Sequence, residues 1–485
     1  MSAHPALSEA GALLRRREGL IRKVAGYSAI RGSAEALVGI RGILLAALLG
    51  PAAFGGWALL RLATRYAALA GLGVFRGLEV ELLHPSGPEA ETTGRSEAAG
   101  AALGFILVVS GSLAAVALLL SAFVAAEHRL ILQGFAAAVV AESVYGYTLV
   151  WTRIRTTLLR YAVLEASTAA LHLLLGVWLA RSFGLGGAFA ALAIAAALGA
   201  GAASSWVEMR PALGRAILNR MLSVGWPMAL TGAVGILLHT ADRWVVAAWG
   251  GRELLGYYAF AGALTSAAAA FALAIRTVVF SEVYGEARVA GAATALQRHL
   301  ERSLMPFATL VPPVLGAIGF CLGPLVELAA PGYAQAVPPA RLFLLGGAAV
   351  GLVNLAAIGA VAAGRQRLLP AYAAVALALN LGLSIVALIA GAGLEGVAAA
   401  SFAGHAVFAA AVVGLNAQLS GVARPDQLVV RALRPMVWCA AAVVIAGHAE
   451  VALDSDAAGL GFYLFLIVPL AAKSRGEWRR MQGER

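Results

Sequence analysis

Long, uninterrupted runs of apolar residues constrain this chain more than any other feature of its sequence. The run from Ala98 to Val124 contains no charged residue. A helix of about 20 apolar residues is long enough to cross a hydrocarbon core of roughly 30 Å. Strands of a membrane barrel would be about half that length and would alternate in polarity. The runs therefore predict an all-α, polytopic membrane protein.

The composition supports the same class. Of the 485 residues, 61% are apolar and only 13% are charged, whereas soluble domains carry about 25% charged residues. The only cysteines, Cys321 and Cys439, cannot form a disulfide framework or a cysteine metal cluster. The formal net charge of +11 would suit a nucleic-acid binder only if the cations shared one soluble face. No soluble domain is expected, so no nucleic-acid partner is predicted.

We expect about fourteen transmembrane helices, each bounded by charged residues or by glycine and proline. The second and third are joined by a charged connection, 76–97. The predicted spans are 25–48, 52–75, 98–124, 131–152, 160–180, 184–206, 222–248, 254–279, 303–329, 340–363, 368–390, 394–417, 435–449 and 458–472.

Lysine and arginine are distributed unevenly between the two sides of these spans. With a cytoplasmic N-terminus, 26 of them fall on the cytoplasmic side and four, namely Arg129, Arg181, Arg252 and Arg341, fall outside. Cationic connections resist translocation, so this ratio predicts that both termini are cytoplasmic in a multi-pass protein of the bacterial inner (plasma) membrane. The segment 1–24 and the basic tail 473–485 are then cytoplasmic. Anionic lipid headgroups are expected partners of these cations.

An internal repeat is visible in the glycine-rich turns. Gly55 and Gly256 are 201 residues apart, and Gly184 and Gly393 are 209 apart. A near-constant offset that contains six helices predicts two pseudo-symmetric halves related by an axis along the membrane normal. We assign 25–207 to the first half, 222–418 to the second and 435–472 to an extra C-terminal helix pair. Such halves would enclose a central cleft that opens to either side in turn.

Several charged residues lie inside the predicted spans, where each costs roughly 2.5 kcal/mol or more and therefore needs a partner, water or a function. The first and seventh helices, and the second and eighth, would be symmetry mates beside the cleft, so their side chains can converge. Arginine binds phosphate oxygens in bidentate fashion, and the acidic residues can position it or take up protons. The predicted substrate-binding residues are Arg31, Glu35, Arg41, Arg61, Arg65, Asp242, Arg243 and Arg276.

An alternative stays open for three of these arginines. Arg31, Arg65 and Arg276 lie near cytoplasmic helix ends and can instead extend to the headgroup region. Ionisable residues within the spans also include Glu142, Glu165, His172, Glu327 and His405. Glu142 is a candidate proton site, with a hydrogen-bonded structural carboxyl as the favoured interpretation, and the two histidines are interpreted as core residues. No metal site or cofactor is predicted. Neither a phosphate-binding loop nor a hydrolase motif is present, so the sequence predicts a transporter and no catalytic residues.

The chain resembles the polysaccharide flippases, also called O-antigen, exopolysaccharide or Wzx-type flippases, of the multidrug/oligosaccharidyl-lipid/polysaccharide exporter superfamily. The resemblance is carried by a glycine-proline turn after the first helix, within Leu48–Trp57, and by Asp242-Arg243 in the seventh. It continues through Leu255-Gly-Tyr-Tyr-Ala259 and Gly393-Leu-Glu-Gly396. It implies translocation of undecaprenyl-diphosphate-linked oligosaccharide repeat units from the cytoplasmic to the periplasmic leaflet.

Other functions remain open at this stage. A lipid II flippase of the same superfamily also has fourteen helices, but the Ser-Arg signature expected near its start is not evident. A drug or cation antiporter would have twelve helices and an acidic cleft. A glycan polymerase or ligase would carry a large periplasmic loop, whereas the predicted outside loops here are short; such a polymerase is a candidate partner instead.

Overall fold

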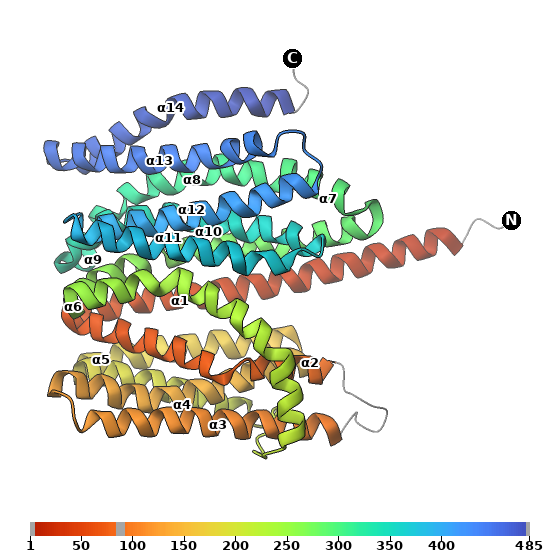
Figure 1. Ribbon diagram of the computed structural model, residues 1–485, viewed down its shortest axis with the longest axis vertical. Coiled ribbons are helices and arrows are strands. Elements are labelled where there is room, and N and C mark those ends of the chain that lie inside the picture. Colours follow the sequence, from red (N-terminus) through yellow and green to blue (C-terminus); the bar gives the residue numbers. More distant parts are fainter. Residues whose placement is uncertain (1–4, 84–92, 482–485) are drawn as a thin grey trace. The chain divides into compact units, whose positions relative to one another are not determined.

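The computed structural model describes the backbone of residues 5–83 and 93–481. Within these ranges every regular element is a helix and no strand occurs (Figure 1), so the predicted all-α class is confirmed. Side chains are described for residues 30, 32–83, 95–126, 128–266, 279, 283, 291 and 293–470. The helices are α1 (Pro5–Ala67), η1 (Ala68–Gly71), α2 (Val74–Leu83), α3 (Thr93–Ser121), α4 (Ala126–Arg155), α5 (Leu158–Ala203), α6 (Arg215–Ala290), α7 (Ala292–His299), the π-helix η2 (Leu300–Leu304), α8 (Met305–Phe320), α9 (Leu322–Ala329), η3 (Pro331–Ala336), α10 (Val337–Ala362), η4 (Gln366–Leu368), α11 (Leu369–Ile389), α12 (Gly393–Leu419), α13 (Pro425–Leu453) and α14 (Asp456–Met481).

Ten helical stretches in the described residues are long and apolar enough to cross a membrane. Three of them, Gly32–Gly71, Leu158–Ala203 and Arg215–Ser266, are 40, 46 and 52 residues long. One crossing needs only about 20 residues. These three stretches are each interrupted by one glycine with non-helical backbone angles, and the count of fourteen spans stays a prediction. The interrupting glycines are Gly50 (φ 72°), Gly184 (φ 58°) and Gly251 (φ 67°).

Side-chain contacts show that the chain reverses at two of these glycines. Arg41 and Trp57 are 16 residues apart and would be separated by about 24 Å in a straight helix, yet the guanidinium carbon lies 5.8 Å from the indole ring centre. Asp242 and Tyr258 are also 16 residues apart, and their side chains form a hydrogen bond of 2.8 Å. The residues on either side of each glycine therefore form a helical hairpin.

The two hairpins touch each other through a reciprocal contact. A Cβ atom added to Gly55 would lie 1.7 Å from the carbonyl oxygen of Arg252, and one added to Gly256 would lie 1.9 Å from that of Pro51. Gly55 and Gly256, like Pro51 and Arg252, are 201 residues apart. Each hairpin thus presents the same glycine to the same backbone position of the other, at the offset that the sequence repeat predicts.

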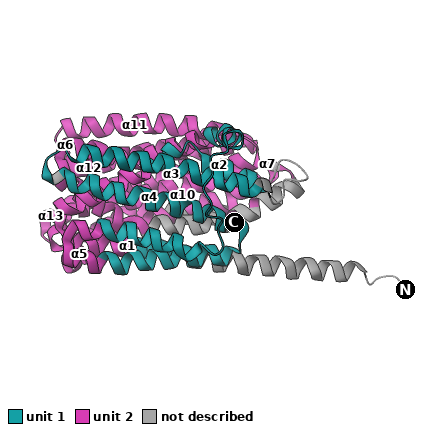
Figure 2. Ribbon diagram, turned by 90° about the horizontal axis from the view of Figure 1, so that it is seen from below, with its two compact units in different colours: residues 1–38, 67–176, 189–227 teal, residues 39–66, 177–188, 228–485 magenta. Residues whose placement is uncertain are grey.

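The chain forms two compact units (Figure 2). Unit 1 comprises residues 1–38, 67–176 and 189–227, and unit 2 comprises 39–66, 177–188 and 228–485. These boundaries differ from those of the predicted halves, because the segments 39–66 and 177–188 pack with the later part of the chain. The division into six-helix halves stays a prediction.

In unit 1, α3 packs against α2 and α4, and the connection after α5 lies across α3. The amide of Ala212 donates to the carbonyl of Gly100 at 2.9 Å. A Cβ on Gly104 would lie 2.1 Å from the Ala212 carbonyl oxygen, so these glycines permit the close approach. Tyr147 and Trp151 of α4 donate hydrogen bonds to backbone carbonyls of the same connection, at 2.7 and 2.9 Å.

In unit 2, α10 packs against both α8 and α12, α11 packs against α12, and α13 packs against α14 and α8. Their contact surfaces are almost entirely aliphatic, and Leu304, Leu345 and Leu355 have no exposed surface. Asn380 of α11 donates a hydrogen bond of 3.3 Å to the Leu238 carbonyl of α6. This bond joins α11 to the hairpin that contains Gly251.

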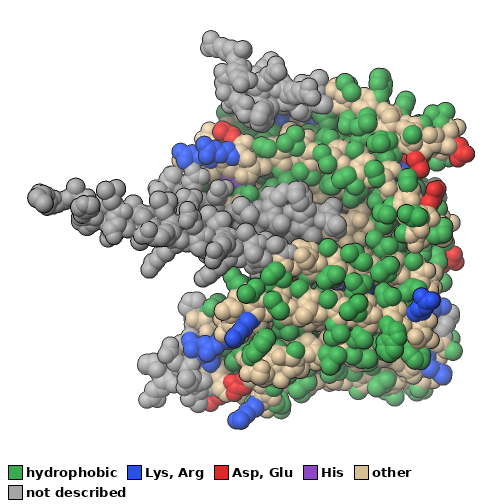
Figure 3. Space-filling model, turned by 180° about the vertical axis from the view of Figure 1, so that it is seen from behind, with side chains coloured by type: hydrophobic (Ala, Val, Ile, Leu, Met, Phe, Trp, Pro, Cys, Tyr) green, Lys and Arg blue, Asp and Glu red, His purple; other side chains and the backbone are tan. Residues whose placement is uncertain are grey.

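Large apolar side chains also cover much of the outside of the described residues (Figure 3). Phe123, Trp178 and Leu328 are 79%, 64% and 86% exposed. Contiguous apolar surface on this scale is typical of protein that is solvated by lipid. The chain is therefore a multi-pass membrane protein.

Candidate functional site

The predicted binding residues fall in different parts of the structure. Arg41, Arg61, Arg65, Asp242 and Arg243 belong to unit 2, where their mutual arrangement is described. The half-buried Glu35 belongs to unit 1. The side chains of Arg31 and Arg276 lie outside the described residues.

Asp242 is the most deeply buried of these residues, at 2% exposure. Its Oδ2 accepts a hydrogen bond of 2.8 Å from the hydroxyl of Tyr258. Its Oδ1 accepts one of 2.8 Å from the backbone amide of Arg243. A buried carboxylate needs such donors, since an unpaired charge in a low-dielectric interior is very costly. Asp242 therefore fixes the two arms of its hairpin together.

Arg243 follows directly and is half-buried. Its Nε atom is buried and has no hydrogen-bond partner in the described residues. An added Cβ on Gly262 would lie 3.0 Å from its Nη2. Gly262 thus leaves room for the guanidinium group, one of whose donors has no partner among the described residues.

Arg41 is only 7% exposed, and its guanidinium stacks over the Trp57 ring. This cation–π contact supplies part of the stabilisation that a buried cation requires. Arg41 is thus held within the first hairpin.

Arg65 and Arg243 both lie close to His239. Their charges act on the imidazole ring, although Arg65 comes from α1 and Arg243 from α6. The same region is held together by a hydrogen bond of 2.8 Å between Tyr66 and Thr240. Arg65 is exposed. The structure thus brings cations of the predicted second and seventh helices to one place.

The depth of the charges follows from the helical rise of 1.5 Å per residue. Arg41, Arg61, Asp242 and Arg243 are eight to eleven residues from the glycine at which their hairpin reverses, which corresponds to roughly 12–16 Å. That distance is about half of a 30 Å hydrocarbon core. The predicted topology puts both reversals at the membrane surface and thus predicts that these four residues lie near mid-depth, too far from either end for simple extension to the headgroups.

A pair of histidines was not found by the sequence analysis. Nδ1 of His239 lies 2.9 Å from Nε2 of His405, and the rings are stacked with their centres 4.9 Å apart. His405 was interpreted as a core residue and is 6% exposed, whereas His239 is exposed. The two are 166 residues apart, so no local spacing could have indicated the pair.

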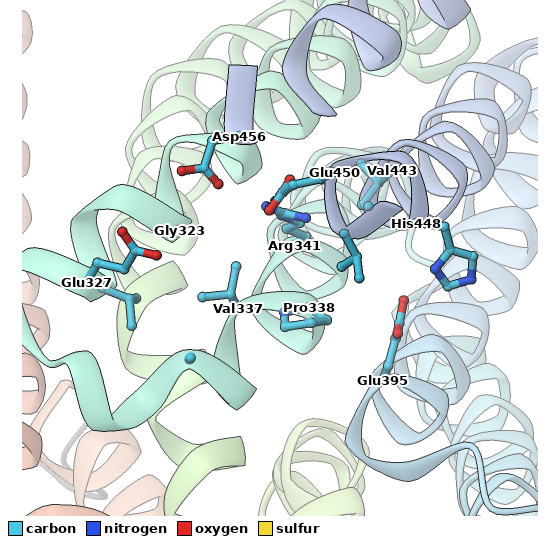
Figure 4. Close-up of a pocket in the computed structure, with 14 residues that line it drawn as sticks. Gly323, Glu327, Val337, Pro338, Arg341, Glu395, Val443, His448, Glu450 and Asp456 are labelled. Atoms are coloured by element: carbon cyan, nitrogen blue, oxygen red, sulfur yellow. Dashed lines mark hydrogen bonds and ion pairs between the residues drawn. The ribbon is translucent and has the colours of Figure 1, made fainter. Parts of the chain in front are cut away.

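Unit 2 also contains a polar cavity of about 260 Å³ where α9, α10, α12 and α13 meet (Figure 4). Both Nη2 contacts from Arg341 to the Glu450 carboxylate are 2.7 Å long, and the guanidinium lies 4.3 Å from the Phe320 ring centre. Glu327, which lies within a predicted span, lines this cavity together with Glu395. No group of three metal-ligating side chains occurs among the described residues. The Arg341–Glu450 pair connects α10 to α13, one of the two C-terminal helices.

Comparison with known proteins gives a family and a fold. The profile of the family described as "Polysaccharide biosynthesis protein" matches residues 44–330. No curated protein matches the chain.

Among solved structures, the lipid II flippase MurJ in an inward closed conformation superposes with a TM-score of 0.69 at 11% identity, over 93% of this chain and 99% of that one. An inward-facing multidrug resistance MATE transporter of the MOP superfamily gives 0.55 at 16% identity, over 85% and 95%. A MOP superfamily transporter from Pyrococcus furiosus, described as having a binding pocket of reverse polarity, gives 0.55 at 16% identity, over 84% and 96%. The chain therefore has the fold of the MOP superfamily flippases and transporters.

Proposed function

The chain belongs to the polysaccharide biosynthesis protein family, and from that premise we propose that it is a flippase for polyprenyl-diphosphate-linked oligosaccharides. It carries repeat units on undecaprenyl diphosphate from the cytoplasmic to the periplasmic leaflet of the inner membrane. Alternating access of a central cleft moves the diphosphate and sugars through protein while the prenyl tail stays in lipid. Both termini are cytoplasmic, and a glycan polymerase is the expected recipient of the product.

The observation that supports this proposal is the convergence of two cations from different helices. Arg65 of α1 and Arg243 of α6 both act on His239, and Nε of Arg243 has no hydrogen-bond partner among the described residues. Cations within a membrane are costly unless they have a function. A diphosphate offers the planar oxygen pairs to which a guanidinium binds best.

The resemblance to other transporters leaves two competing substrates. A lipid II flippase and a drug transporter share this fold, and the Pyrococcus furiosus neighbour is described as having reversed pocket polarity. We therefore use the charge of the binding residues to distinguish an anionic lipid-linked substrate from a cationic drug. Arginine near mid-depth favours an anionic headgroup over a cationic drug, and the family favours a polysaccharide precursor over lipid II.

The test is transport by arginine variants in proteoliposomes that contain fluorescent undecaprenyl-diphosphate-linked glycan. Arg41→Ala and Arg243→Ala should each abolish flipping while the protein still inserts and is recovered in normal amount. Arg181→Ala is the matched control, since Arg181 is an exposed residue on the predicted outer side. Full transport by both the Arg41→Ala and the Arg243→Ala variants contradicts the proposal. Faster flipping of lipid II than of the glycan carrier favours the competing function.

A further inference from the structure

His239 and His405 form a hydrogen-bonded chain whose proton positions follow from chemistry. Nδ1 of His405 lies 2.8 Å from the carbonyl oxygen of Ser401. A carbonyl only accepts, so this nitrogen carries hydrogen. The neutral ring then presents a bare Nε2, which must accept a hydrogen from Nδ1 of His239. His239 in turn is left with a bare Nε2.

The pair can therefore take up one proton without losing a bond. A proton that binds Nε2 of His239 makes an imidazolium and leaves both hydrogen bonds of the chain intact. A proton on Nε2 of His405 would instead place two N–H groups against each other.

The pair lies inside the membrane rather than at its surface. His239 is twelve residues from Gly251, and His405 is twelve residues from Gly393. Each distance corresponds to roughly 18 Å of helix, beyond the middle of a core of about 30 Å. Because α6 supplies one ring and α12 the other, the bond also joins two helices.

The charges around the pair are of both signs. Arg65 of α1 and Arg243 of α6 act on His239, and Asp242 of α6 acts on His405. The adjacent α11 contains no Asp, Glu, His, Lys or Arg. In α12 the other ionisable residue is Glu395, ten residues from His405. Burial and the His405 ring oppose a positive charge on His239 most strongly, and the two guanidinium groups add to that opposition. An anion bound to the guanidinium groups would offset their part of it.

We propose that the His239–His405 pair is a proton-binding site that fills when a diphosphate anion binds beside Arg65 and Arg243. This inference rests on the proposed function, since it takes the anion to be the headgroup of the lipid carrier. The proton enters on Nε2 of His239, and no other bond changes. Binding of the anion and of the proton then strengthen each other reciprocally. The proton is a coupling ion that accompanies the headgroup at this stage of the cycle.

The test counts the protons that accompany a bound diphosphate. The full chain in lipid nanodiscs is titrated with farnesyl diphosphate by calorimetry, in buffers of different ionisation heat and between about pH 5 and 8, where histidine titrates. The wild type should take up about one proton more per bound probe than His239→Gln. The slopes of log Kd against pH for the wild type and for His239→Gln should differ by one, so that the ratio of their Kd values changes tenfold per pH unit. The titration of the probe itself cancels in this comparison.

His448→Gln is the matched control, because His448 is an exposed histidine that lines the cavity beside Arg341 and Glu450, and it should keep the wild-type proton count. Equal counts in the wild type and His239→Gln overturn the inference but leave the proposed function standing. Failure of the wild type to bind the probe overturns both. If His239→Gln does not fold, the 15N NMR spectrum of the histidines in the wild-type protein tests the inference instead. One imidazole that becomes imidazolium on addition of the probe supports the inference, and an unchanged spectrum overturns it.

Discussion

At the scale of single residues, charge inside an apolar run was the informative signal. It singled out Asp242, whose carboxylate accepts hydrogen bonds from Tyr258 and from the Arg243 amide, and Arg243, whose Nε has no hydrogen-bond partner among the described residues. The partner of Asp242 was not predictable, because Tyr258 looks like an interfacial aromatic residue in the sequence. The His239–His405 bond was beyond prediction for the same reason: a tertiary contact leaves no local pattern.

The bond between Tyr258 and Asp242 should matter for stability. Tyr258→Phe removes the only hydroxyl donor to Oδ2 among the described residues and leaves a buried acceptor unsatisfied, at a cost of about 1–3 kcal/mol. The neighbouring Tyr257→Phe is the control, since the hydroxyl of Tyr257 makes only a long contact of 3.5 Å with Glu253. Thermal unfolding in detergent measures both. Equal losses in the two variants would contradict the assigned role of the bond.

At the scale of elements, glycines with positive φ set the architecture. The sequence placed helix boundaries close to Gly50, Gly184 and Gly251, and all three adopt left-handed backbone angles. Gly393, the predicted equivalent of Gly184, has φ of 59° against 58°. The position of a glycine turn depends on the local sequence, so these helix boundaries could be predicted. Which helix faces pack together could not be predicted, because apolar residues face both lipid and protein.

The reciprocal hairpin contact should be intolerant of even one methyl group. Gly55→Ala and Gly256→Ala each drive a Cβ into a backbone carbonyl, and overpacking of this kind costs about 1–3 kcal/mol. Gly232→Ala is the control within α6, because its Cβ would meet no atom within 4 Å. Unfolding midpoints in detergent should fall for the first two variants and not for the third. A Gly256→Ala protein as stable as the wild type would contradict the backbone contact.

At the scale of the whole molecule, the apolar runs and the family resemblance were sufficient for the fold class and the superfamily. The number of spans and their grouping were harder to predict, since three stretches of 40 to 52 residues are continuous helix except at one glycine each. The compact units cut across the predicted halves. Grouping depends on which small-residue faces pack together, and alanine and glycine are too frequent here to mark those faces.

Orientation in the membrane is the testable property at this scale. In a Cys321→Ala, Cys439→Ala background, Arg181→Cys should react with an impermeant maleimide added outside spheroplasts, because the charge distribution places Arg181 outside. Arg365→Cys should react only after the membrane is opened, and both positions are exposed in the structure. Labelling of both from the same side would contradict the predicted topology.

The crossing of Gly55 and Gly256 also has a consequence for how such chains diverge. A methyl group at either position would separate the two backbones and so open both close approaches at once. After the first loss, the second glycine would no longer be under steric constraint, and the double replacement would cost less than the two single ones added together. Among related sequences, the two glycines should therefore covary: both positions are glycine, or neither is.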